Sequence, residues 1–102
     1  MNYIIIEVPD MNDSVSRVVL NGRQYQIRFT WNDTGGFWTF GLLDALGNPL
    51  LVGIRIVPRF PLNLFCETYD IPSGMFAVMT EQERIGRSDF AEGKAQFVFA
   101  PA

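Results

Sequence analysis

Histidine is absent from the 102-residue sequence, and cysteine occurs once, as Cys66. Without histidine, the chain lacks the usual general base near neutral pH, the commonest zinc ligand and the partner of nucleophilic serine or cysteine. A single cysteine cannot form an intramolecular disulfide, which fits a reducing cytoplasm. Because no imidazole is present to activate Cys66, we expect an inert, buried thiol.

Basic residues are also scarce. Eight Lys and Arg stand against eleven Asp and Glu, which gives a net charge of −3 and a pI near 4.7. Nucleic-acid binding would favour a basic stripe, so we expect no nucleic-acid partner. No apolar run is long enough to span a bilayer, and the first ten residues lack the pattern of a secretory signal. We therefore expect no membrane partner.

Motifs that would hold a metal or a phosphate fail on spacing. Residues 10–15, DMNDSV, resemble a calcium loop only faintly, because Ser14 takes the fifth position and Val15 takes the place of the required glycine. The glycines near residue 35 do not follow the G-x-G-x-x-G spacing of a phosphate-binding loop. Asp33 and Asp44 could form an acid–base pair, but both stand where turns begin. We expect no enzyme activity, no cofactor and no metal.

Hydrophobic residues recur instead at a period of two. With 48% hydrophobic and 19% charged residues, the composition is that of a globular protein, and the length suits one core, so we expect a single domain over residues 1–102. Residues 23–31 alternate as a half-buried strand should. The preceding Asn21-Gly22 is typical of a type I′ turn, so residues 14–20 and 23–31 are predicted to form a hairpin.

Turn signals divide the rest of the chain into further strands. We expect Val52, Ile54 and Ile56 to share one face of their strand. Residues 58–74 read as a long loop with a short helical turn near Leu62 to Cys66, and residues 81–93 as an exposed loop. The fold class is therefore all-β, a small antiparallel β-barrel or sandwich built from a meander of hairpins. About seven strands are expected, the others lying at residues 3–8, 37–43, 50–57, 75–80 and 94–100.

Residues 29–40, FTWNDTGGFWTF, are unusually rich in aromatic side chains. They fall on two predicted strands around a turn, where Trp31 and Trp38 would lie opposite each other and stabilise the pair by up to about 1 kcal/mol. The main interpretation is a core with strand pairing. The alternative is a ligand platform, which would make the protein a small β-barrel binding module for a peptide or glycan.

Four motifs follow one another along the chain. They are L-x-G-x-x-Y (Leu20, Gly22, Tyr25), W-N followed by G-x-W (Trp31, Asn32, Gly36, Trp38), D-x-x-G-x-P-L (Asp44, Gly47, Pro49, Leu50) and a G-x-x-I-V-P strand end (Gly53, Ile56, Val57, Pro58). Their order resembles the small baseplate plug proteins of contractile-tailed phages, typified by a cyanophage plug protein. The resemblance covers roughly residues 15–65, and the closing strand near residues 97–99 also fits. The chain departs from the family pattern after Pro58, where Arg59 and Phe60 stand in place of an expected glycine.

This resemblance implies a structural role. The protein would be a plug or adaptor in the tail baseplate of the virion, synthesised in the host cytoplasm. It would pack between the central spike or hub and the surrounding tail proteins, in several symmetric copies.

Two segments are candidates for partner binding. The N-terminal segment 1–13 could be an exchanged arm in which Ile4, Ile5 and Ile6 add as a strand to a neighbour's sheet, or these residues could pair within their own subunit. The loop after Pro58 could dock a partner or cover the open end of the core. Its candidate contacts are Arg59, Phe60, Leu62 and Phe65, since arginine and aromatic residues are enriched in binding hot spots.

Overall fold

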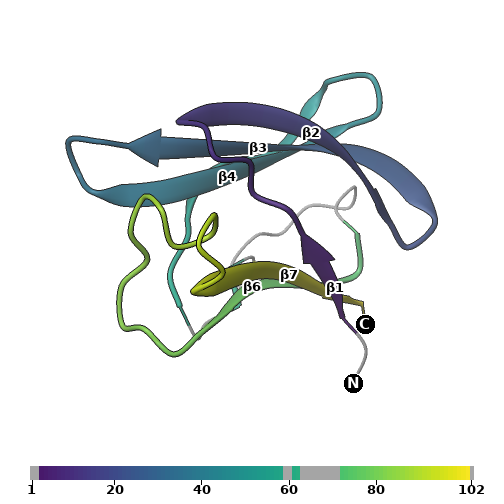
Figure 1. Ribbon diagram of the computed structural model, residues 1–102. Helices are drawn as coiled ribbons and strands as arrows, with labels where there is room; N and C mark the ends of the chain where they lie inside the picture. The colour runs from purple at the N-terminus through teal and green to yellow at the C-terminus, as the bar shows by residue number, and fades with distance from the viewer. Residues whose placement is uncertain (1–2, 59–60, 63–71, 102) are drawn as a thin grey trace.

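Strands dominate the computed structural model, which describes residues 3–58, 61–62 and 72–101 (Figure 1). Within these residues there are seven strands and no helix, which confirms the expected all-β class. Residues 63–66 of the predicted short helical turn, Cys66 among them, lie outside the described residues. In chain order the strands are β1 (Ile4–Ile6), β2 (Asp13–Leu20), β3 (Arg23–Asn32), β4 (Phe37–Asp44), β5 (Pro49–Arg55), β6 (Gly74–Thr80) and β7 (Ala95–Pro101).

Four consecutive strands form the predicted meander. β2, β3, β4 and β5 are neighbours in that order in one antiparallel sheet. Asn21 and Gly22 between β2 and β3 have φ angles of 54° and 77°, and positive φ at both central positions is what a type I′ turn requires. Trp31 on β3 faces Trp38 on β4, as predicted.

The remaining strands form a second antiparallel sheet in the order β1-β7-β6. The central strand β7 pairs with β6 along its whole length and with β1 on its other side, where Ile5 lies opposite Val98. Strands from the two ends of the chain therefore lie side by side in this sheet (Figure 1).

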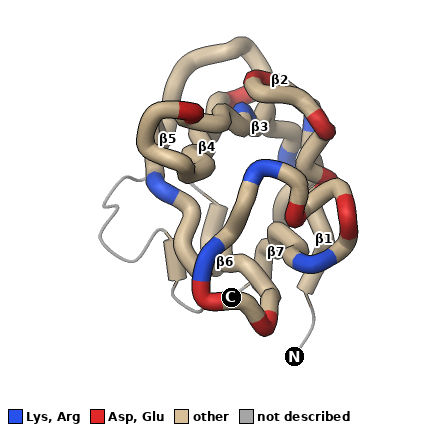
Figure 2. Tube along the Cα trace, turned by 60° about the vertical axis from the view of Figure 1, so that its left-hand side comes forward, with Lys and Arg blue, Asp and Glu red and all other residues tan. Residues whose placement is uncertain are grey.

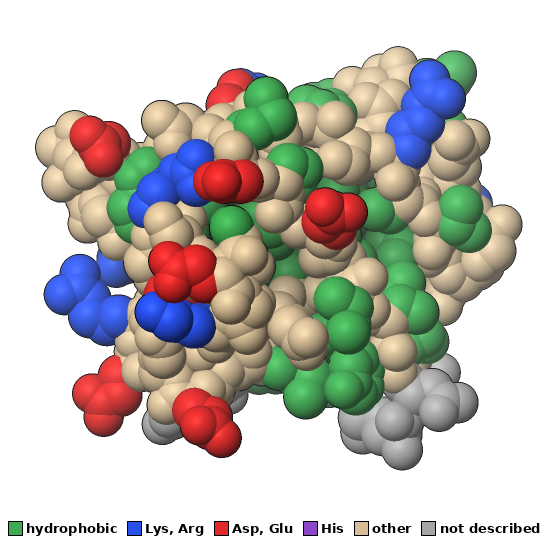
Figure 3. Space-filling view, viewed as in Figure 1, with side chains coloured by type: hydrophobic (Ala, Val, Ile, Leu, Met, Phe, Trp, Pro, Cys, Tyr) green, Lys and Arg blue, Asp and Glu red, His purple; other side chains and the backbone are tan. Residues whose placement is uncertain are grey.

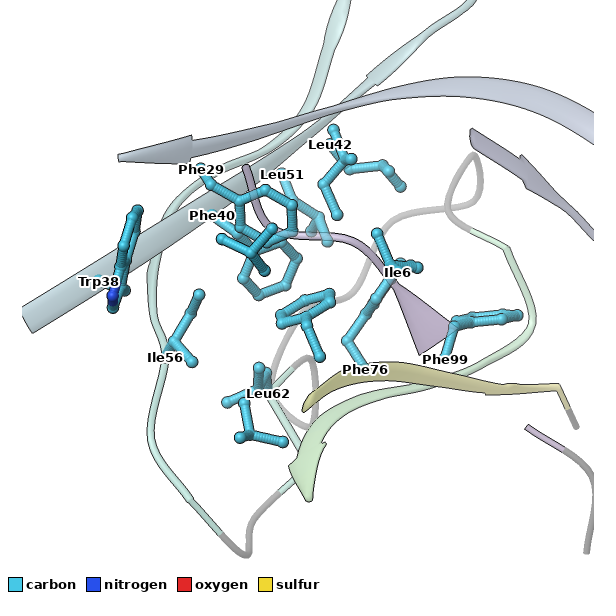
Figure 4. Close-up of a cluster of buried hydrophobic side chains, with 14 of the residues drawn as sticks. Ile6, Phe29, Trp38, Phe40, Leu42, Leu51, Ile56, Leu62, Phe76 and Phe99 are labelled. Carbon is cyan, nitrogen blue, oxygen red and sulfur yellow. The ribbon is translucent and has the colours of Figure 1, made fainter. Parts of the chain in front are cut away.

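The two sheets pack face to face through phenylalanine side chains (Figure 4). Phe97 on β7 makes edge-on contacts with Phe29 on β3 and Phe40 on β4, at ring-centroid distances of 5.0 and 5.1 Å. The ring centroids of Phe76 on β6 and Phe40 are 5.3 Å apart. Burying one such side chain stabilises the fold by about 1.5–3 kcal/mol. The largest side chains with almost no exposure are Trp38, Phe29, Phe40, Phe76, Phe97, Phe99, Leu20, Ile27 and Leu42.

The sheets are not closed into a barrel. Among the described residues, no strand of the four-stranded sheet pairs with a strand of the three-stranded sheet. The expectation of a barrel or sandwich is therefore met only as two facing sheets with open edges. Neighbours along the chain, β1 and β2, belong to different sheets, and so do β5 and β6.

The expectation that Val52, Ile54 and Ile56 share a face is wrong, because β5 contains a bulge. The β4–β5 register shifts by one residue opposite Gly41, so that Val52 and Gly53 both occupy the space of one partner. Gly53 has a φ of +62°, a conformation that favours glycine. Val52 is consequently exposed, whereas Ile56 is buried.

Residues 81–93 form a loop whose charged side chains are mostly exposed, as predicted, but the loop also folds back onto β4. The indole N–H of Trp38 donates to the carbonyl of Gly86 at 3.2 Å. The same ring packs against Phe90 at a centroid distance of 5.9 Å, and Ile85 is buried in the core. Two apolar side chains in a charged segment are enough to attach it to the sheet.

Candidate partner-binding surface

The tryptophan pair is part of the core and its cover, not an open platform. Trp38 is 1% exposed, and its ring packs against that of Trp31 at a centroid distance of 5.5 Å. Trp31 is half-buried and donates its indole N–H to Asp33 at 3.3 Å. The guanidinium of Arg87 lies 5.4 Å from the centre of the Trp38 ring. These contacts confirm the interpretation of core and strand pairing.

The predicted arm residues are divided between the inside and the outside of the molecule. β1 pairs with β7 of its own chain, and Ile6 is buried against the core. Ile4 and Ile5 are 41% and 57% exposed. In the single chain, β1 thus takes the intrasubunit pairing that was one of the two expectations, and it leaves two isoleucines at the surface.

Ile5 belongs to an apolar surface that we call the outer face, the side of the β1-β7-β6 sheet that points away from the core. In the strand register, Ile5, Val98 and Ala77 form one row across the sheet. Met75 and Met79 at the ends of β6 are each more than 40% exposed. The outer face consists of Ile5, Met75, Ala77, Met79, Val98 and Ala100, with Gln96 as its polar member. Exposed apolar patches of this kind mark interaction sites.

Most of the outer face was not predicted from the sequence, although the sequence carries a signal for it. Residues 75–79 and 97–100 are apolar at both odd and even positions. Strands of that kind are usually covered on both faces. The core covers one face of β6 and β7, whereas Ile5, Met75 and Met79 on the outer face remain 42–57% exposed around the buried Val98.

The loop candidates are only partly described. Leu62 is buried in the core, and its N–H donates to the carbonyl of Phe76 at 2.7 Å. Arg59, Phe60 and Phe65 lie outside the described residues. Of this group, Leu62 therefore supports the reading of the loop as a cover for the core.

Carboxylates that were considered for acid–base chemistry are engaged in turns. Asp44 accepts hydrogen bonds from the backbone N–H groups of Leu46 and Asn48, both at 2.9 Å, and from the Asn48 side chain at 3.0 Å. These bonds, the one from the Asn48 backbone most strongly, lower the pKa of Asp44 and keep it ionised. Asp33 accepts a hydrogen bond from the indole N–H of Trp31 at 3.3 Å. Asp44 therefore organises the turn between β4 and β5, and Asp33 binds a side chain at the end of β3.

The segment that faintly resembles a calcium loop is used for internal pairing. Arg87 donates to Asp10 at 2.8 Å and to Asn12 at 2.6 Å. Asp13 accepts from both Nε and Nη2 of Arg28, at 2.8 and 2.7 Å. The hydrogen bond from Arg28 is the main cause that lowers the pKa of Asp13. No group of three His, Cys, Asp or Glu in the described part of the chain could hold a metal ion.

Charge is dispersed over the surface. Among the described residues, the positions of Lys and Arg are interspersed with those of Asp and Glu along the Cα trace (Figure 2). No helix in the described ranges is long and apolar enough to cross a bilayer. The surface that stands out is therefore apolar rather than charged.

Comparison with protein families gives a match over the whole chain. A family model described as cyanophage baseplate Pam3 plug gp18 matches residues 1–102, the whole chain. No curated protein matches the sequence.

Proposed function

The chain belongs to the cyanophage baseplate plug family, a structural family of the virion tail, and we propose that it is a plug or adaptor between the central spike or hub and the surrounding tail proteins. In this proposal the tail is contractile, and several symmetric copies are made in the host cytoplasm before they assemble. Function then consists of fitting between subunits rather than of a reaction.

The observation that carries the proposal is the outer face. A plug must lose water from its surface when it packs, and apolar surface contributes about 25 cal/mol for each Å² removed from water. Ile5, Met75 and Met79 project from three positions around the buried Val98. A rigid apolar sheet face of this kind suits a permanent interface, which is more hydrophobic than a transient one.

Two further contacts complete the proposal. Arg59, Phe60 and Phe65 in the loop after Pro58 would add polar and aromatic anchors, with Leu62 holding the loop against the core. Residues 1–13 would serve as an arm exchanged between copies, since the β1 of one copy could replace that of another on β7 without any change in the pairing.

Virion incorporation tests the role. In a phage whose own gene for this protein is deleted, we expect wild-type protein supplied from a plasmid to restore the baseplate. Ile5→Asp and Met79→Asp should reduce the amount per particle at least tenfold, measured by mass spectrometry of purified virions, because each places a charge in the outer face. Val52→Asp is the matched control, since Val52 is 75% exposed on the other sheet.

Melting temperatures of the purified variants separate assembly from folding. Incorporation of Ile5→Asp and Met79→Asp at the wild-type level would remove the outer face from the proposal. Absence of the wild-type protein from baseplates would remove the proposal itself.

A further inference from the structure

Strand β2 forms an edge of the four-stranded sheet. It pairs with β3 over all eight of its residues, Asp13–Leu20, and within the described residues no strand pairs with its other side. Its outward side chains include Val15 and Val19, which are 56% and 62% exposed.

The position of the turn shows which backbone groups of β2 are free. Leu20 and Arg23 flank a two-residue turn and so form a hydrogen-bonded pair. Hydrogen-bonded and non-hydrogen-bonded pairs alternate in an antiparallel sheet, so every second residue of β2 before Leu20 also directs its N–H and C=O groups towards β3. The hydrogen bond from the Trp31 N–H to the Asn12 carbonyl, at 2.7 Å, agrees with this alternation, because Asn12 lies an even number of residues from Leu20. The N–H and C=O groups of Val15, Arg17 and Val19 therefore point away from β3. They form an unpaired strand edge.

This edge borders a groove between the two sheets. The groove has a volume of about 410 Å³, within the range of ligand pockets. Ile4, Ile5 and Ile6 of β1 line one side, and residues 16–19 of β2 line the other. Figure 3 shows apolar side chains sunk between the upper and the lower part of the molecule on this side. The groove thus has the isoleucines of β1 on one side and the strand edge of β2 on the other, with polar and apolar side chains both in its lining.

Other edges are less suited to pairing. β1 has three residues, and β5 is distorted by the bulge at Gly53. The Phe76 carbonyl of β6 already accepts a bond from Leu62. Short strands and bulges are the usual means of protecting an edge from added strands. β2 combines full length with a regular register and lacks both protections.

The charge at the centre of the edge indicates the kind of occupant. Arg17 projects between Val15 and Val19 and, in the described structure, makes no ion pair with Glu7 or any other carboxylate. If two copies paired antiparallel through β2 with Val15 opposite Val19, the Arg17 side chains would face each other, and like charges directly opposite destabilise a sheet. In this register, the edge therefore disfavours a second copy of β2.

From these observations we infer that the groove between β1 and β2 receives an extended segment of a different baseplate protein, which adds as a strand to β2. Its backbone pairs with Val15, Arg17 and Val19, its apolar side chains cover the two valines, and a carboxylate faces Arg17. Main-chain bonds give such an interaction its affinity, and the side chains give it specificity. The inference rests on the proposed function and names one of its contacts.

A proline substitution tests the backbone contact. Arg17→Pro removes an N–H that points outward, a position where edge strands tolerate proline. We expect purified Arg17→Pro to fold and its amount in virions to fall at least tenfold. Val18→Pro is the contrasting variant, because the Val18 N–H belongs to the pairing with β3 and its loss should lower the melting temperature.

Two further variants test the charge without altering the backbone. Arg17→Glu should reduce incorporation and Arg17→Lys should largely restore it, and both should melt like the wild type. If Arg17→Pro does not fold, this pair decides the question. Incorporation of Arg17→Glu at the wild-type level would overturn the inference.

Photocrosslinking identifies the occupant. The photoreactive residue p-benzoylphenylalanine replaces Val19, and in a control it replaces Val52 on β5. In intact virions, the Val19 position should give an adduct with a different tail protein that the Val52 position does not give. An adduct with a second copy, or no adduct beyond that of the control, would overturn the inference. Absence of the wild-type protein from virions would instead overturn the proposed function, so the two failures are distinguishable.

Discussion

Replacing Phe97 by alanine should remove much of the stability of the protein. Phe97 is fully buried, and its ring is the contact through which β7 reaches Phe29 and Phe40 in the opposite sheet. The ring centroids of Phe97 and Phe76, which belong to the same sheet, are 5.9 Å apart. Phe→Ala substitutions in protein cores cost about 3–5 kcal/mol, the loss combining transfer and cavity terms. Because three rings line this site and cannot easily collapse into the cavity, we expect about 4 kcal/mol.

Urea unfolding followed by tryptophan fluorescence measures this loss. A domain of this length typically has a free energy of unfolding of about 5–15 kcal/mol, so Phe97→Ala should remain folded only marginally. A loss of about 4 kcal/mol corresponds to a fall in melting temperature of roughly 15–30 °C. The slope of free energy against urea should stay unchanged if the unfolded state is unaffected.

A matched variant shows whether the position of the ring matters. Phe90 is half-buried at the rim, with a ring contact to Trp38, so Phe90→Ala should cost clearly less than Phe97→Ala. A double-mutant cycle between Phe29 and Phe97 should give a coupling of about 0.5–1.5 kcal/mol. A loss of under 1 kcal/mol for Phe97→Ala, or no coupling, would refute the packing of the two sheets through these rings.

Two other predictions concern the backbone and the surface charges. Gly53→Ala should destabilise the protein by about 1–2 kcal/mol in urea unfolding, because alanine is strained at a φ of +62°. The added methyl group would meet nothing within 4 Å, so the loss reports the backbone conformation alone. Gly86→Ala is the control, because Gly86 does not have a positive φ. The lowered pKa of Asp13 means that its pairing with Arg28 stabilises the folded state above the ordinary pKa near 3.8 and that this contribution is lost as the pH falls through the lower folded value. The difference in melting temperature between wild type and Asp13→Asn should therefore shrink between pH 6 and pH 2, and a difference independent of pH would contradict it.

The four-stranded meander could be predicted because its signals are local. Alternation fixes which side chains of residues 23–31 are buried, and Asn21-Gly22 fixes the turn that precedes them. The bulge in β5 was missed, although a glycine inside a strand pattern is its usual sign. Gly53 was read as an ordinary strand residue, so Val52 was assigned to the wrong face.

The division into two sheets could not be predicted, because it depends on contacts between residues that are distant in the sequence. β1 and β7 pair across nearly the whole chain, and turn chemistry says nothing about pairings of that range. The outer face could not be predicted for the same reason. Ile5 was identified from its own segment, but Met75, Met79 and Val98 join it only through the strand register. A surface assembled from three separate strands becomes visible only once the order of the strands is known.

The groove beside β2 depends on contacts that lie outside it. Arg87 binds Asp10 and Asn12 and lies over the ring of Trp38, so it attaches the connection between β1 and β2 to β4 and to the loop that folds onto it. An exposed ion pair alone contributes little, but here one guanidinium combines two hydrogen bonds with a ring contact. The two walls of the groove are thereby positioned before any partner arrives. A preformed surface loses less conformational entropy on binding, which favours the strand addition proposed for this groove.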